Sequence, residues 1–96
     1  MVMIIAKPCV TMKGIVVQLY SWDKEIKLDL TKVSRCLKEK GIEVKKLIPN
    51  MLLIVIMNGF ETSIYPGGKV IIKELTDTKR GEEIAKLIYD CAGVEG

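Results

Sequence analysis

The stretch that decides the fold is PNMLLIVIMNGFETSIYPGGKVII, residues 49–72. It predicts three short strands joined by two tight turns, because Asn58-Gly59 and Pro66-Gly67-Gly68 tolerate the positive φ that hairpin turns require. The first of these strands is apolar at every position from Met51 to Met57. A sheet covered by helices on one side needs only alternating apolar residues. We therefore expect something to cover the second face of this strand as well.

Two helices are expected on either side of this stretch. The first spans Leu30–Lys40, with the Asp29 carboxylate accepting from the free amides of its first turn and Gly41 in the left-handed conformation at its end. The second follows the capping oxygens of residues 76–78 and ends at Gly93. In both helices the apolar side chains recur at helical spacing, so each has one face to bury.

The remaining segments predict further strands. Ile15–Tyr20 alternates in part, and Ile42–Leu47 alternates with charged residues that suit an edge strand. Val2–Ala6 is stopped by Lys7-Pro8, which predicts an edge strand or an irregular arm. The fold class is α+β, a curved antiparallel sheet of about five to six strands with two helices on one face. Residues 1–96 form a single domain, with residues 1–13 as an extra N-terminal arm or strand.

The amino-acid composition limits which kinds of site and partner we expect in this chain. The chain has a net charge of +3 and 49% hydrophobic residues, an ordinary globular balance. Its longest apolar run is too short to cross a bilayer and its start is unlike a signal peptide, so we expect a cytoplasmic protein without a membrane partner. It has no histidine, and Cys9, Cys36 and Cys91 are widely spaced. We therefore expect no metal site, no disulfide, no cofactor and no enzymatic activity, with reduced, partly buried thiols.

Two short motifs in this order resemble a known family. Residues 28–33, LDLTKV, are similar to a Leu-Asp-Leu helix start, and residues 63–70, SIYPGGKV, are similar to Leu-Ile-Phe-Ser-Ser-Gly-Lys-Met. The chain resembles one half of a TATA-binding protein core, whose two tandem repeats form a saddle over DNA. The resemblance covers about residues 14–93. It implies a half-saddle, which would pair with a second copy through the first strand of the repeat, as the two halves do in that family.

The resemblance also implies a binding face. The two phenylalanines that the family wedges between base steps fall on Ile48 and Tyr65 here, and a lysine is retained as Lys69. The family's groove-reading asparagine falls on Gly14, its groove-facing threonines fall on Gln18 and Lys73, and its phosphate-binding arginine falls on Ile54. The concave face implied by this mapping comprises Val16, Gln18, Ile48, Asn50, Leu52, Ile54, Ile56, Tyr65, Lys69, Ile71 and Lys73. The opposite face, which would pack under the helices, comprises Ile15, Val17, Met51, Leu53, Val55, Ile64, Val70 and Ile72.

Two functions remain open at this point. An apolar face of this extent marks an interaction surface, unless the N-terminal arm or a second copy covers it. The first hypothesis is a homodimeric nucleic-acid-binding or transcription-associated module, favoured by Lys69 and the net positive charge. The alternative is a protein-interaction or regulatory module that binds a polypeptide on the same face and does not bind DNA. The loss of the family's asparagine, threonines and arginine favours this alternative.

Overall fold

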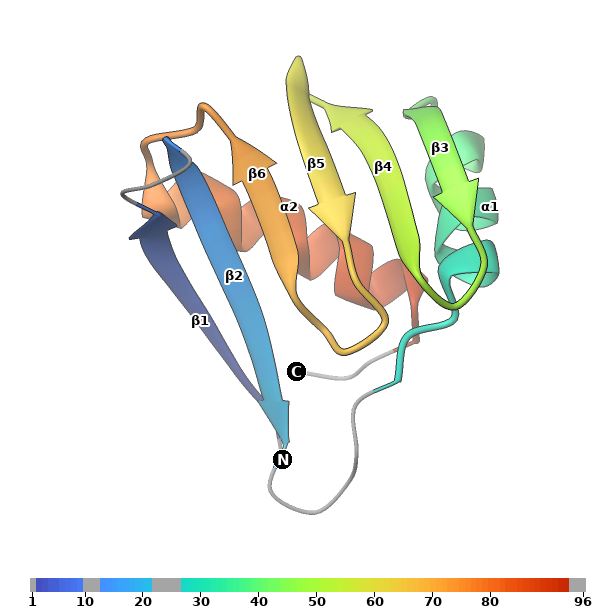
Figure 1. Cartoon of the computed structure of the whole chain (residues 1–96), viewed down its shortest axis with the longest axis horizontal. Coiled ribbons are helices and arrows are strands. Elements are labelled where there is room, and N and C mark those ends of the chain that lie inside the picture. Colours follow the sequence, from blue (N-terminus) through green and yellow to red (C-terminus); the bar gives the residue numbers. More distant parts are fainter. Residues whose placement is uncertain (1, 10–12, 22–26, 94–96) are drawn as a thin grey trace.

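A computed structural model describes residues 2–9, 13–21 and 27–93 of the chain (Figure 1). These residues form six strands and two helices. In chain order the elements are β1 (Val2–Cys9), β2 (Gly14–Ser21), α1 (Leu30–Glu39), β3 (Glu43–Ile48), β4 (Leu52–Met57), β5 (Phe60–Ile64), β6 (Val70–Lys73) and α2 (Thr78–Cys91).

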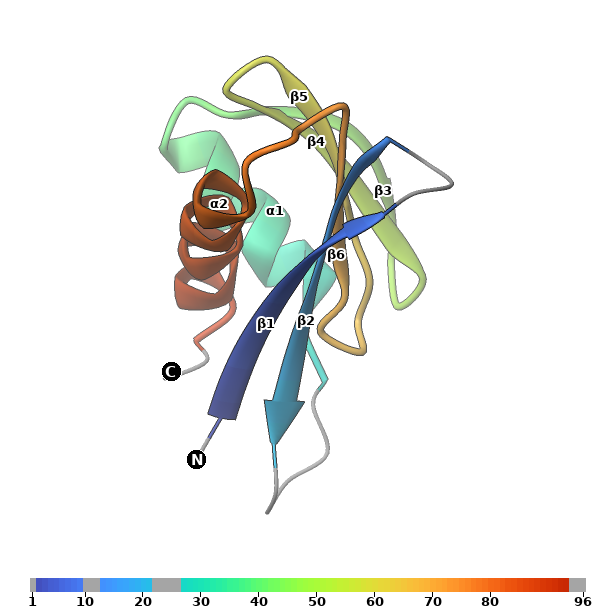
Figure 2. The same ribbon diagram turned by 90° about the vertical axis from the view of Figure 1, so that its left-hand side faces the viewer.

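The strands form one antiparallel sheet in the order β1-β2-β6-β5-β4-β3. Both helices lie on the same side of this sheet, behind the strands in Figure 1 and to one side of them in Figure 2. Helix α1 packs against β3 and β4, α2 packs against β1 and β2, and the helices contact each other. The predicted fold class, a curved antiparallel sheet carrying two helices on one face, is confirmed.

The helices begin and end where their capping residues stand. The Asp29 carboxylate accepts from the amides of Thr31 and Lys32 at 3.1 and 3.3 Å, and Asp77 does the same for α2. Each bond satisfies an amide that the first helical turn leaves without a partner. Gly41 and Gly93, with φ of +83° and +81°, follow the two helix ends and let the chain turn away.

The core lies between the helices and one face of the sheet. Every second residue of β2, β4 and β6 points into it, which is the alternation that a half-covered sheet requires. Its fully buried members include Ile15, Val17, Leu30, Val33, Leu37, Leu53, Val55, Ile64, Val70, Ile72 and Ile88. Met51 was predicted in this set, and that prediction is wrong. It lies in the turn between β3 and β4 and is 66% exposed, because β4 begins one residue later than the apolar run does.

The N-terminal segment is a full strand, and it does not lie across the sheet. Val2–Cys9 pairs antiparallel with β2 along its whole length, from Val2 opposite Ser21 to Cys9 opposite Gly14. Of the two predictions for this segment, the edge strand is confirmed and the irregular arm is wrong. The strand also occupies the outer edge of β2, which is the edge that the family resemblance assigns to pairing with a second half.

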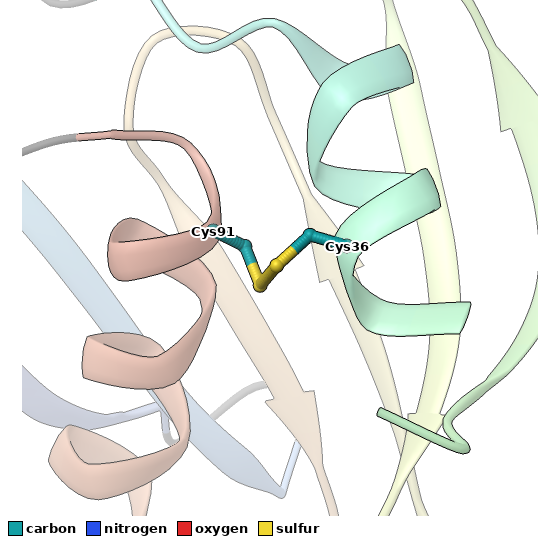
Figure 3. Close-up of a disulfide and its surroundings, with 2 residues drawn as sticks. All are labelled: Cys36 and Cys91. Atoms are coloured by element: carbon teal, nitrogen blue, oxygen red, sulfur yellow. A yellow bond between two sulfur atoms is a disulfide. The ribbon is translucent and has the colours of Figure 1, made fainter. Parts of the chain in front are cut away.

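A disulfide joins the two helices, and this corrects the prediction of reduced thiols. Cys36 of α1 and Cys91 at the end of α2 are bonded, with their Cα atoms 5.6 Å apart (Figure 3). Both residues were correctly placed on the apolar stripes of their helices. The stripes face each other over the sheet, however, and this brings together two thiols that are 55 residues apart in sequence.

Breaking this bond should destabilise the fold substantially. Closing a loop of 55 residues in the unfolded chain accounts for a stabilisation of about 4 kcal/mol in the chain-entropy model. We expect the variant Cys36→Ser Cys91→Ser to lose up to that amount in urea unfolding monitored by circular dichroism. A thiol reductant should lower the stability of the unmodified chain to the same level and leave the double variant unchanged. Equal stability of the oxidised and reduced chains would contradict the bond.

Candidate functional site: the open face of the sheet

The face of the sheet turned away from both helices is the candidate site, and we call it the open face. Strand register assigns its members, because residues directly opposite each other on neighbouring strands point to the same side. Ile54 of β4 is opposite Lys46 and Ser63, and Ile71 of β6 is opposite Ser63 and Val16. Continuing this pattern, the open face comprises Met3, Ile5, Lys7, Val16, Gln18, Tyr20, Glu43, Lys46, Ile48, Leu52, Ile54, Ile56, Glu61, Ser63, Ile71 and Lys73.

The structure brings together nearly all of the residues that the sequence assigned to this face. Tyr65 and Lys69 join them from either side of the turn between β5 and β6, where the amide of Tyr65 donates to the Lys69 carbonyl at 2.9 Å. Asn50 is the exception, and its placement on the face is wrong. It has φ of +65° and lies in the turn between β3 and β4, because Ile48 already ends β3.

An apolar strip runs along β4 and the end of β3 on the open face. Ile48, Leu52, Ile54 and Ile56 are half-buried although the strand register directs their side chains away from both helices. Ile71, nearer the centre, is 7% exposed. Among the described residues these side chains are shielded only by their neighbours on the same face, so their outer atoms remain open to a ligand. Burying such atoms against a partner is favourable in proportion to the apolar area removed from water.

Charged residues interrupt the apolar strip at one end. Glu61 of β5 bonds to two lysines, with its Oε2 2.9 Å from Lys73 Nζ and its Oε1 3.2 Å from Lys45 Nζ. The hydrogen bonds from Lys73 and Lys45, together with their charges, hold the pKa of Glu61 below its usual value, and the pKa of Lys73 is raised in return by Glu61. This carboxylate therefore stays ionised. It neutralises part of the positive charge of Lys45 and Lys73, which could otherwise pair with the phosphate groups of a nucleic acid.

The turn between Tyr65 and Lys69 is held in place from the helix side of the sheet by a buried tyrosine. The Tyr89 hydroxyl of α2 donates to the Gly68 carbonyl at 2.7 Å, and the amide of Leu28 donates to the Pro66 carbonyl at 2.8 Å. Burial raises the pKa of Tyr89 well above its usual value, so it remains a neutral donor. Helix α2 thus positions one end of the open face through a single hydrogen bond.

Sequence reasoning missed Glu61, Lys45 and the whole contribution of β1. The alternation of Glu61 and Ser63 with the apolar residues of β5 could have placed Glu61 on the open face. Lys45 could not have been found in that way. It sits where the register between β3 and β4 shifts between Val44 and Lys46, and this irregularity lets its side chain reach Glu61.

Potential metal ligands are dispersed over the described part of the chain. Within residues 2–9, 13–21 and 27–93, no group of three or more potential His, Cys, Asp or Glu ligands comes together. No helix in the part of the chain that the structure describes is long and apolar enough to cross a membrane. What the open face can do chemically is bury apolar surface and form ion pairs at its margins.

Removing the Tyr89 hydroxyl should destabilise the chain and loosen the Pro66-Gly67-Gly68 turn. Tyr89→Phe leaves the Gly68 carbonyl buried without its donor, which costs about 1–3 kcal/mol. We expect this loss in urea unfolding, together with faster amide exchange at Gly68, whose N–H closes the turn onto the Tyr65 carbonyl. The matched control is Tyr20→Phe at a tyrosine that is 46% exposed, which should change neither quantity.

The Glu61 cluster predicts a defined pH dependence. A carboxylate whose pKa is lower in the folded state than in the unfolded chain stabilises the fold above its ordinary pKa near 4.5, and this contribution is lost as the pH falls through the folded value. Lys73→Ala should raise the Glu61 pKa toward the ordinary value in a carboxyl NMR titration. Lys69→Ala removes a charge from the same face without touching Glu61 and should have a smaller effect. Equal shifts in the two variants would argue against a specific pair.

Comparison with protein-family models, curated proteins and solved structures gives no match to this chain.

Proposed function

We propose that this protein is a non-enzymatic binding module that holds an apolar segment of a polypeptide on the open face of its sheet. The observation that carries the proposal is the apolar strip of Ile48, Leu52, Ile54 and Ile56, which the helices leave uncovered and β1 does not cross. Large exposed apolar areas on soluble domains mark interaction surfaces.

The charges around the strip support a polypeptide over a nucleic acid. Two of the lysines beside it, Lys45 and Lys73, are already bonded to Glu61. The two arginines of the chain, Arg35 and Arg80, lie on the helices, away from this face. Nucleic-acid binding depends on cations that are free to replace the counterions of phosphate, and groove reading depends strongly on arginine. A mixed rim of lysine and glutamate around an apolar centre suits a protein interface better.

Nucleic acid remains the second candidate, and a specific observation favours it. Lys7 and Lys69 are both exposed and belong to the same face as Tyr65, which offers an aromatic ring for stacking. The order of strand, helix, four strands and helix from β2 to α2 also agrees with the resemblance to half of a TATA-binding protein core. On this reading the duplex would lie across the same strip.

The proposal is tested by selecting peptides from a displayed random library on the immobilised protein and measuring their affinities by calorimetry. We expect apolar peptides whose affinity falls at least about tenfold in Ile54→Asp, because a charge then replaces an apolar contact at the centre of the strip. The matched control is Met51→Asp, the same kind of change at an exposed residue of the β3–β4 turn. Thermal unfolding of both variants shows that each remains folded.

Two outcomes would contradict the polypeptide proposal. One is a set of peptides that bind Ile54→Asp as well as the unmodified chain. The other is salt-sensitive binding of a duplex oligonucleotide that is weakened by Lys7→Ala Lys69→Ala. In that case Lys38→Ala Lys86→Ala, which removes the same charge from the exposed surface of the two helices, should leave binding unchanged. That second result would assign the open face to nucleic acid instead.

A further inference from the structure

The two outer edges of the described sheet are protected very differently. Strand β3 ends the sheet on one side with a register shift and three charged residues, Glu43, Lys45 and Lys46. Bulges, charges and prolines are the usual means by which edge strands avoid pairing with other chains. Strand β1 ends the other side with eight residues in continuous register with β2, a single charge, Lys7, and a proline, Pro8, only near its end. No other described strand pairs with its outer edge.

Pro8 indicates which backbone groups of β1 point outward. A proline has no N–H, so within a sheet it is tolerated where that donor would face away from the neighbouring strand. Successive residues of a strand direct their backbone groups to opposite sides, so Ile4 and Ala6 share the outward direction of Pro8. Lys7 and Ile5 then exchange hydrogen bonds with Val16 and Gln18, their partners in β2. The outer edge therefore presents the N–H and C=O groups of Ile4 and Ala6.

This outward pattern is complementary to itself when two copies run antiparallel. Placing Ile5 opposite Ile5 of a second copy sets Ile4 opposite Ala6 and Ala6 opposite Ile4, so the outward groups exchange hydrogen bonds as in an ordinary ladder. Pro8 falls opposite Val2 at the end of the pairing, where its missing donor matters least. Lys7 falls opposite Met3, so the two copies of Lys7 stand at opposite ends of the new ladder and no like charges meet.

We propose that the outer edge of β1 is the site at which a second copy of this chain binds, through antiparallel β1–β1 pairing around a two-fold axis at Ile5. The side chains beside the edge fit this occupant. Met3 and Tyr20, opposite each other and 42% and 46% exposed, are among the few large apolar residues exposed in the described chain. The aliphatic stem of Lys7 from the second copy packs over Met3. The two open faces then form one continuous surface. The pairing does not depend on peptide binding.

A cross-linking experiment tests the position of the axis. Two Ile5 residues facing each other at a non-hydrogen-bonded position have Cα atoms about 4.5 Å apart, within reach of a disulfide. We expect Ile5→Cys, in a Cys9→Ser background with the Cys36–Cys91 bond intact, to form a covalent dimer with oxidised glutathione as the oxidant. Met3→Cys in the same background is the matched control. Its two copies stand about 13 Å apart, four residues along the ladder, and should not cross-link.

Charge substitutions at Met3 test the register in solution without any covalent bond. In sedimentation equilibrium, Met3→Glu sets an acid opposite Lys7 twice per dimer and should strengthen association by roughly two- to thirtyfold. Met3→Lys should weaken association to a similar extent. Ala6→Pro removes an outward donor from each chain while sparing the bonds to β2, and it should abolish the dimer.

Three results would overturn the proposal. The first is a chain that sediments as a monomer at every concentration. The second is a Met3→Cys variant that cross-links as readily as Ile5→Cys. The third is an equal response of association to Met3→Glu and Met3→Lys. If Ala6→Pro proves unfolded, the Met3 variants still test the β1–β1 pairing, because they alter only an exposed side chain. All these measurements are made without peptide, so they stand or fall separately from the polypeptide proposal.

Discussion

Two helices cover one face of a six-stranded sheet, and this imbalance governs the rest of the structure. The covered face is built from strands whose inward residues are almost all branched and apolar, such as Val17, Val55 and Ile72. The other face has no layer of its own in the described chain, yet β4 is as apolar on that face as on the first. A sequence that needed only to fold would place polar residues there. The apolar outward residues of β4 are therefore the feature that folding alone does not explain.

The covalent link between the helices follows from the same layout. Helices α1 and α2 sit side by side over the sheet, and their contact is made along the stripes that bear Cys36 and Cys91. A modest core of a chain this short leaves a small margin of stability, and cross-linking α1 to α2 limits how far the covering layer can separate from the sheet. The hydrogen bond from Tyr89 to Gly68 has a related effect, because it ties the same layer to a turn on the sheet.

Local signals in the sequence were enough for most of the fold. The turns at Asn58-Gly59 and Pro66–Gly68, and the caps at Asp29 and Asp77, fix where elements begin and end, since each depends on only a few neighbouring residues. Features that depend on contacts between distant segments were missed. The Cys36–Cys91 bond and the reach of Lys45 to Glu61 both depend on how packed elements sit relative to one another. Asn50 was misplaced because a one-residue difference in the end of β3 moves a side chain from a face into a turn.

The two outer strands of the sheet differ in how they are protected against pairing with other chains. An unprotected edge strand promotes aggregation, and β3 is protected by its charges and by a register shift. Strand β1 has no register shift and only one charge, Lys7, and its Met3 and Ile5 place apolar side chains of the open face at that edge. If selection had acted only against association, we would expect as many charges on β1 as on β3. The sheet order instead places the less protected edge at the opposite end of the sheet from the apolar strip on β3 and β4, so a partner bound at β1 would enlarge the face that the helices leave uncovered without covering that strip.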